Sequence, residues 1–167
     1  MENCIACGCD GVDRLAAMNI GGEDFALENA MAPAEETLLV PKQQMIFAAN
    51  SGGLMPRGFI ASVAGFGDWT AFCAMVRRSR RFGFRGAGCI HRGQVPIVNE
   101  EYTPDTAEMD YARRVTEENV PAEAAGRASF ALDGRMIDVP VVARARRLLE
   151  RQAAIDTREA AKRAATG

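Results

Sequence analysis

Short apolar runs alternate along the chain with segments whose hydrophobic residues recur at helical spacing. Three apolar runs predict buried strands, at residues 15–20, at residues 58–61 within the segment 54–63, and at residues 87–90. Helical spacing predicts helices after these runs, at residues 41–49, 69–82 and 103–119. Because strand and helix alternate, the pattern favours a parallel α/β sheet.

Start and stop signals support each predicted helix. Pro41 suits a first helical position, because its missing N–H needs no partner there. Residues 30–40 before it are expected to form a loop, with a helical turn as the alternative. Asp68 precedes the second helix as an N-cap, and Gly83 ends it. Thr103-Pro104 reads as a cap followed by the first residue of the third helix.

The C-terminal part of the chain has a different pattern. Two short apolar segments, 130–132 and 135–137, flank Asp133-Gly134, a strong hairpin signal because both turn residues tolerate positive φ. Pro140 then opens a last helix with apolar residues at helical spacing. The Ala-, Arg- and Lys-rich tail beyond Asp156 is expected to be a fraying helix that carries no chemistry.

Composition excludes several classes of protein. The 167 residues carry a formal charge of −2, which gives no basic field for nucleic acid. No apolar run approaches the length of a membrane span, and no signal-peptide pattern opens the chain. Five cysteines, an odd number at irregular spacing, fit a reducing compartment better than a disulfide scaffold. We therefore expect a cytoplasmic protein that binds neither nucleic acid nor membrane.

Two clusters of residues each allow two interpretations. Cys4, Cys7 and Cys9 lie close together, but a zinc site needs a second ligand pair, and the alternative is small buried thiols. Four arginines crowd the end of the second predicted helix, at positions 77, 78, 80 and 81. They are either a solvated helix end that complements the helix dipole or a binding site for a phosphate group.

Polar residues follow two of the predicted strands. Glu23 and Asp24 come after the first strand, and His91, the only histidine, follows the third together with Gln94. Binding groups in α/β proteins concentrate in the loops at the carboxyl ends of strands, because the sheet holds those loops in place while they vary. These four residues are therefore the first candidates for a site.

The same regions carry three motifs of a known family. Gly-Phe-x-Gly-x-x-x-Ile-His-x-x-Gln spans residues 83–94 and is followed by Val-Asn and by Tyr-Thr-Pro. Gly-Gly-Glu-Asp-Phe stands upstream at 21–25, and Leu-Asp-Gly-Arg-Met-Ile-Asp-Val-Pro stands downstream at 132–140. In this order the motifs resemble the citrate lyase β-subunit-like (CitE-like) family, within the HpcH/HpaI aldolases and acyl-CoA lyases.

The resemblance implies a fold and its parts. The family's fold is a TIM (β/α)₈ barrel, and this chain resembles the C-terminal portion, with the last three strand-helix units of a partial barrel followed by a β-hairpin plus helix lid. The expected domains are a barrel half at residues 1–128, the lid at 129–156 and a frayed tail at 157–167.

The resemblance also implies a magnesium site. Family members use Mg²⁺ to hold a 2-oxo acid and to offset the charge of a developing enolate. Asp24 matches the second metal carboxylate, and the alternative is that it caps the following turn. Counted without gaps, the first metal glutamate falls before Met1. Glu2 can replace it only through a deletion, and is otherwise an ordinary helix residue.

Three further residues match family positions. His91 and Gln94 match a substrate-binding loop, although this chain has Arg92 where the family has proline, so His91 is either a general base or a structural residue. Asp138 matches a lid aspartate that reaches a neighbouring subunit and takes part in proton transfer as a catalytic residue. Its alternative is to cap the helix that Pro140 opens.

The leading hypothesis is a Mg²⁺-dependent acyl-CoA lyase or aldolase acting on a citryl-CoA- or malyl-CoA-like thioester or a 2-oxo acid. Its site looks incomplete in this chain, and the resemblance implies a homo-oligomer, trimeric or hexameric. The alternative hypothesis is a non-catalytic fragment or paralogue that associates with a partner chain, because half a parallel barrel leaves unpaired strand edges.

Overall fold

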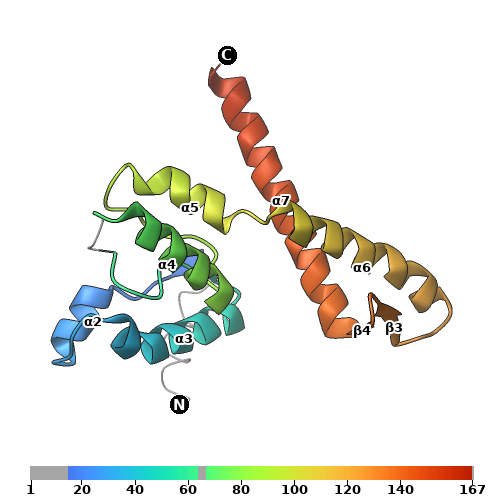
Figure 1. Cartoon of the computed structure of the whole chain (residues 1–167), viewed down its shortest axis with the longest axis horizontal. Coiled ribbons are helices and arrows are strands. Elements are labelled where there is room, and N and C mark those ends of the chain that lie inside the picture. The colour runs from blue at the N-terminus through green and yellow to red at the C-terminus, as the bar shows by residue number, and fades with distance from the viewer. Residues whose placement is uncertain (1–14, 64–66, 167) are drawn as a thin grey trace. The chain divides into compact units, whose positions relative to one another are not determined.

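The computed structural model describes residues 15–63 and 67–166, and the chain divides into two compact units (Figure 1). The first unit ends at Tyr102 and the second begins at Thr103. The helix predicted near 103–119 therefore belongs to the same unit as the hairpin. The division into a barrel half that ends at 128 and a lid that starts at 129 stays a prediction.

The first unit is built on a parallel pair of very short strands. β1 (Ala17–Met18) pairs with β2 (Met55–Pro56), and Ala17 lies opposite Met55. The helices of this unit are α2 (Gly22–Glu28), α3 (Glu35–Ser51), α4 (Trp69–Phe82) and α5 (Gln94–Tyr102). Helices α2 and α3 form the crossover that strands running in the same direction require.

The core of the first unit joins three of these helices to the chain after β2. Ile46 of α3, Val76 of α4 and Val98 of α5 are buried together with Phe59 and Ile60, which follow β2. Burying each such side chain stabilises the fold by about 1.5–3 kcal/mol. This packing, more than the short sheet, holds the loops at the strand ends in place.

Helix α4 forms as predicted, because its signals are local. The Asp68 carboxylate accepts hydrogen bonds from the N–H groups of Thr70 (2.9 Å) and Ala71 (3.0 Å), which confirms the N-cap. Gly83 ends the helix with φ 111°, a value that favours glycine.

Two of the predicted strands differ in the structure. The strand expected on the apolar run 58–61 does not form. The strand of this region is β2, which ends just before that run, because Gly58 adopts φ 131° and breaks the extended backbone. No strand forms at 87–90 among the residues that the structure describes. Instead the Arg85 N–H donates to the Pro56 carbonyl and the Gly58 N–H donates to the Gly86 carbonyl, both at 2.9 Å. The third chain segment thus lies along β2, but a few residues earlier than predicted.

Helix boundaries were predicted less well than helix identities. Helix α3 begins at Glu35 and includes Pro41 in its interior, so the prediction that Pro41 starts it was wrong. Thr37 supplies the missing start signal, because the Ala34 N–H donates to its Oγ1 (3.2 Å). Helix α5 was not predicted, and its first residue is Gln94.

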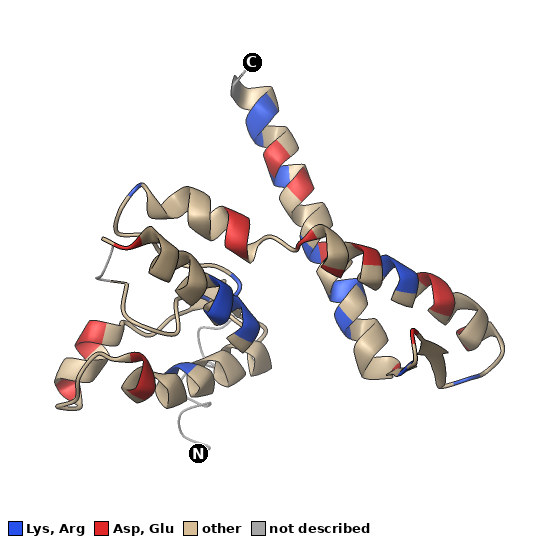
Figure 2. Ribbon diagram, viewed as in Figure 1, with Lys and Arg blue, Asp and Glu red and all other residues tan. Residues whose placement is uncertain are grey.

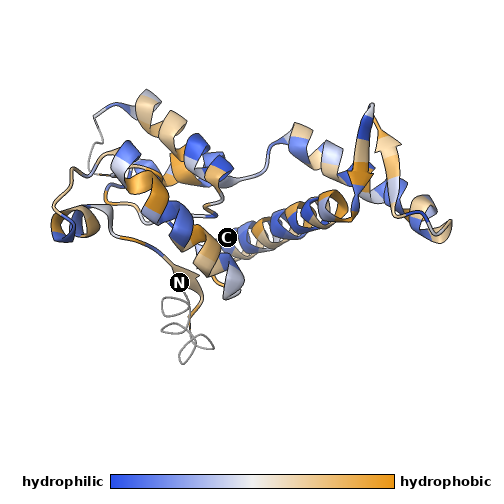
Figure 3. Cartoon of the chain, turned by 90° about the horizontal axis from the view of Figure 1, so that it is seen from below, coloured by the Kyte–Doolittle hydropathy of each residue, from blue (hydrophilic) through white to orange (hydrophobic). Residues whose placement is uncertain are grey.

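The second unit packs a hairpin against two helices. Its elements are α6 (Thr106–Ala124), β3 (Ser129–Leu132), β4 (Arg135–Asp138) and α7 (Val139–Thr166). Asp133 and Gly134 have φ 51° and 73°, which confirms the predicted hairpin turn. Hydrophobic and hydrophilic residues alternate along α7 (Figure 3). Val115, Ile137 and Val142 form the buried centre of this unit.

Helix α6 starts two residues after the predicted position. Asp105 is its N-cap: the carboxylate accepts from the Glu108 N–H (2.8 Å), and the Glu108 carboxylate accepts from the Asp105 N–H (3.0 Å). The helix continues through Pro121 to Ala124, beyond the predicted end near 119.

The described residues thus form a mixed α/β fold that is rich in helix and has two small sheets. Across 15–63 and 67–166, no helix is both long enough and apolar enough to span a lipid bilayer.

Candidate functional site

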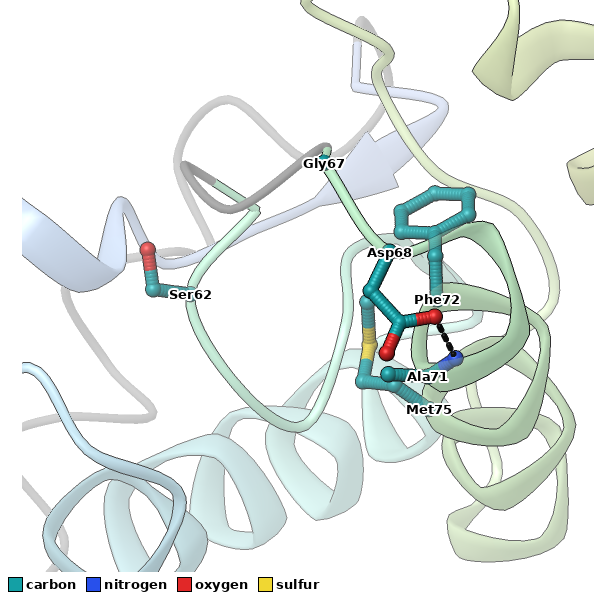
Figure 4. Close-up of a pocket in the computed structure, with 6 residues that line it drawn as sticks. All are labelled: Ser62, Gly67, Asp68, Ala71, Phe72 and Met75. Carbon is teal, nitrogen blue, oxygen red and sulfur yellow. Dashed lines mark hydrogen bonds between the residues drawn. The ribbon is translucent and has the colours of Figure 1, made fainter.

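The loops that follow β1 and β2 meet beside a cavity. The Ser62 hydroxyl, in the loop after β2, donates a hydrogen bond to the Glu23 carboxylate in the first turn of α2. Ser62 also lines an open cavity of about 320 Å³. We call it the rim cavity; it is lined by Ser62, Gly67, Asp68, Ala71, Phe72 and Met75. Figure 4 shows Ser62 across this cavity from Asp68 and the start of α4.

Asp24 is the third residue of α2 and is exposed to solvent. Its Oδ2 lies 2.9 Å from the position that a Cβ on Gly21 would occupy, so the carboxylate folds back over the start of the helix. The N-cap is Gly21, which means that Asp24 does not cap α2. The positive end of the helix dipole favours a carboxylate at this place. Its assignment as a metal ligand stays a prediction.

Lys42 of α3 lies behind this turn and is only 4% exposed. Its Nζ donates a hydrogen bond to the Ala61 carbonyl at 2.9 Å. A Cβ on Gly22 would stand 3.4 Å from the same Nζ, so the ammonium lies close to the backbone where α2 begins. Burial lowers the pKa of Lys42 to about 8, and the negative charge of Glu23 partly opposes that shift.

His91 is exposed and lies beside the start of α4. Its Nδ1 accepts a hydrogen bond from the Gly93 N–H (3.1 Å), and its ring centroid is 5.7 Å from that of Trp69. Trp69 follows Asp68, which lines the rim cavity. The loop with His91 and the loop with Ser62 therefore both approach the first turn of α4.

Gln94 is fully buried. Its Oε1 accepts hydrogen bonds from the N–H groups of Ile90 (2.9 Å) and His91 (3.2 Å), so the side chain fixes the backbone of the His91 loop. Its Nε2 is also buried, and it has no hydrogen-bond partner among the residues that the structure describes. This geometry makes Gln94 a brace for the loop, and its assignment to substrate binding stays a prediction.

Asp138 ends β4 in the second unit. Its carboxylate accepts a hydrogen bond from the Val141 N–H at 3.3 Å, which is the helix-capping contact weighed against the lid role. A capping carboxylate keeps a second oxygen available, so the contact leaves the predicted catalytic role untested.

The described residues would supply only part of the predicted magnesium site. Within 15–63 and 67–166, no three His, Cys, Asp or Glu side chains converge as a metal cluster. Asp24 offers the carboxylate oxygen that Mg²⁺ prefers, but this ion requires several oxygens around it. Glu2 and the three N-terminal cysteines lie outside the described residues. The carboxylate of Asp24 fits magnesium as one ligand, and the described residues do not provide the further oxygens that the ion would need.

Sequence reasoning missed Lys42 and Ser62. Both contacts join segments far apart in the chain, 19 residues from Lys42 to Ala61 and 39 residues from Ser62 to Glu23. A usable signal existed for Lys42, because it is one of only two lysines in a chain with eighteen arginines.

The arginines at the end of α4 are partly engaged in ion pairs. Arg77 pairs with Glu101, which raises the pKa of the arginine, and Arg78 pairs with Glu35 at 2.7 Å. Figure 2 shows the positive charge gathered at this end of α4. An open cavity of about 500 Å³ lies beside Arg78, Arg81 and Phe82. Such surface pairs favour the interpretation of a solvated helix end.

No protein-family model matches the chain. Among curated proteins it is 30% identical over 141 residues to the citrate lyase subunit beta of Escherichia coli K12, covering 83% of this chain and 46% of the relative. It is 29% identical to the citrate lyase subunit beta-like protein of Deinococcus radiodurans, covering 85% and 50%. It is 27% identical to the human mitochondrial citramalyl-CoA lyase, covering 78% and 38%. The chain thus spans half or less of the length of these relatives.

The solved structures that match the chain carry similar names. CitE from Mycobacterium tuberculosis, in complex with magnesium, acetoacetate and coenzyme A, matches with a TM-score of 0.54 at 28% identity, over 67% of this chain and 40% of that one. A citrate lyase from Burkholderia xenovorans LB400 matches with a TM-score of 0.67 at 19% identity, over 84% and 46%. The second likeness supports the fold alone.

Proposed function

Because the chain belongs to the citrate lyase β-subunit-like (CitE-like) family, we propose that it supplies part of a Mg²⁺-dependent site for cleaving or forming a C–C bond in a CoA thioester. The observation that carries the proposal is the position of the Gly21–Asp24 turn. It follows β1 directly and is hydrogen-bonded through Glu23 to the loop that lines the rim cavity. In such folds the catalytic and binding residues lie in the loops at the carboxyl ends of the parallel strands.

We assign Asp24 as one carboxylate ligand of the ion. Bound Mg²⁺ would polarise a carbonyl oxygen and offset the negative charge of an enolate. The Gly21 backbone leaves the space that the Asp24 carboxylate occupies, so the turn presents an exposed oxygen. Further oxygens would come from Glu2 or from a second segment of protein, since Mg²⁺ needs several.

The remaining roles follow from the family and from the contacts of each residue. His91 would contact the substrate from the loop that Gln94 braces. Asp138 would transfer a proton from a lid formed by the hairpin and α7, in a homo-oligomer where the lid reaches another subunit. The fold would be the last part of a TIM barrel, with β1, β2 and the segment beside β2 as its strands.

The substrate class would be a CoA thioester of a hydroxy acid, such as citryl-CoA, malyl-CoA or citramalyl-CoA. The names of the relatives include citrate lyase and citramalyl-CoA lyase. The acyl group would be distinguished by assaying each thioester in parallel.

The direct test is cleavage of these thioesters by the purified chain with and without Mg²⁺. Asp24→Asn keeps the size of the side chain and removes its charge, and should lower the Mg²⁺-dependent rate by about tenfold or more. Glu28→Gln, at the exposed end of the same helix, is the matched control and should leave the rate unchanged. Cleavage that is equally fast in Asp24→Asn would refute the ligand role.

A second candidate function is association with a partner chain that supplies the rest of the barrel. The observation that favours it is the apolar surface near the two-stranded sheet, where Leu15 and Met55 are 52% and 38% exposed. Among residues 15–63 and 67–166, β1 pairs with β2 alone, and the edge of a short parallel sheet is a template for further pairing. Size-exclusion chromatography with light scattering would distinguish a defined trimer or hexamer of this chain from a monomer or aggregate that needs a partner.

A further inference from the structure

A buried lysine of α3 lies close to the start of α2 and to the loop after β2. Lys42 is 4% exposed, whereas the other lysine of the chain, Lys162, lies exposed on α7. Lysine is almost never fully buried unless its charge is matched. The buried position therefore requires a structural reason.

The contacts of Lys42 give that reason. The side chain leaves α3, passes the backbone of Gly22 at the start of α2, and donates to the Ala61 carbonyl after β2. A Cβ on Gly22 would stand 3.4 Å from Nζ and 3.0 Å from Cδ1 of Leu38, so glycine at this position lets α3 approach closely.

Two side-chain hydrogen bonds tie the described parts of the two loops together beyond the paired strands. The backbone pairing of β1 and β2 ends where the Arg57 N–H donates to the Met18 carbonyl. Beyond that point, the hydrogen bond from Ser62 to Glu23 connects the loop after β2 directly to the start of α2. The hydrogen bond from Lys42 to Ala61 connects the same loop to α3, which packs against the start of α2. Both bonds attach to consecutive residues of that loop.

We propose that Lys42 is a positioning residue that holds the first turn of α2, which carries Asp24, against the loop lining the rim cavity. The proposal depends on the proposed function only for its consequence in metal binding. The arrangement also explains both glycines of the Gly-Gly-Glu-Asp motif, because Gly21 leaves space for the Asp24 carboxylate and Gly22 leaves space for Lys42.

The first experiment measures the position of α2 without any ligand. Lys42→Met keeps the unbranched chain up to the position of Cε but lacks the ammonium and cannot donate a hydrogen bond, and Lys162→Met is the matched control on the second unit. Amide hydrogen exchange of the α2 segment should be about tenfold faster or more in Lys42→Met and unchanged in the control. Unchanged exchange in a folded Lys42→Met protein would overturn the proposal.

The second experiment measures affinity for Mn²⁺, used as a spectroscopic substitute for Mg²⁺. Removing a positive charge near carboxylates should by electrostatics alone tighten cation binding. A positioning role predicts the opposite, an affinity weaker by about threefold or more in Lys42→Met. Equal or tighter binding, where wild-type binding depends on Asp24, would refute the positioning of Asp24 by Lys42.

The two experiments separate the possible failures. If the wild-type chain binds no Mn²⁺ through Asp24, the proposed function fails, and the exchange measurement still decides whether Lys42 holds α2. If Lys42→Met does not fold, Gly22→Ala replaces it, because the added methyl group presses on both Leu38 and Lys42. It should accelerate exchange in α2 in the same way, and unchanged exchange in that variant would count against the proposal.

Discussion

The burial of Lys42 predicts an unusual dependence of stability on pH. Its pKa falls from 10.5 in the unfolded chain to about 8 in the folded protein, with burial as the main cause. Between these two values the unfolded chain holds a proton that the folded protein has released. Stability therefore rises with pH across this window, because the unfolded state binds more protons. Below about pH 8 the folded protein carries the full penalty of a buried charge.

The size of the effect follows from the same shift. Each pKa unit corresponds to about 1.4 kcal/mol, so the full window corresponds to roughly 3 kcal/mol. From pH 8 to pH 9.5 the gain should be about 2 kcal/mol. The charge of Glu23 moderates the shift, and its loss in Glu23→Gln should move the pKa of Lys42 further down.

Urea unfolding of the wild-type chain and of Lys42→Met, each from pH 7 to pH 10, measures this effect. Other groups titrate in the same range, but they contribute equally to both proteins and cancel in the difference. The wild type should gain stability relative to Lys42→Met as the pH rises through 8. In parallel, ¹³C-labelled lysine should give two titrating signals, with Lys162 as the exposed reference. A difference in unfolding free energy between the two proteins that does not change with pH would contradict the described burial. So would a Lys42 signal whose titration midpoint lies above pH 10.

Three further substitutions test the local geometry. Gly83→Ala places a side chain at φ 111° and 3.2 Å from Cγ2 of Ile46, so the free energy of unfolding, measured by thermal unfolding, should fall by about 1–3 kcal/mol. An unchanged free energy of unfolding would argue against the left-handed cap. Asp68→Ala removes the N-cap of α4 and should cost about 1 kcal/mol in urea unfolding, and an unchanged midpoint would contradict the capping role. Gly21→Ala pushes the Asp24 carboxylate aside; Mg²⁺ affinity should fall by titration calorimetry while the melting temperature changes little, and unaltered affinity would remove this explanation of Gly21.

Local signals in the sequence were sufficient for some elements of the fold. Asp68 caps the start of α4, Gly83 ends the helix, and Asp133-Gly134 forms the hairpin turn. These features could be predicted because caps and turns depend on a few neighbouring residues. The end of β2 could not be predicted in this way. Gly58 leaves no room for a side chain, since its Cβ would lie 2.6 Å from Oδ1 of Asn19, a contact across about forty residues of sequence.

The candidate site was predicted in part. The motif of Gly21 to Asp24 does stand at the carboxyl end of β1, where the sequence placed it. Gln94 was expected in a loop, and it is instead the buried first residue of a helix, because its amide satisfies the backbone N–H groups of the preceding turn. The rarity of lysine singles out Lys42 in the sequence, but no local pattern places it, and its contacts with the start of α2 and with Ala61 follow from the packing of α3.

The central claim is that the turn after β1 presents a carboxylate to Mg²⁺, and calorimetric titration of Mg²⁺ into the purified chain tests it most directly. Asp24→Asn and Glu28→Gln would be titrated under the same conditions. The account predicts that wild type and Glu28→Gln bind the ion alike and that Asp24→Asn binds it about tenfold more weakly or not at all. Binding of equal strength in all three proteins would contradict it.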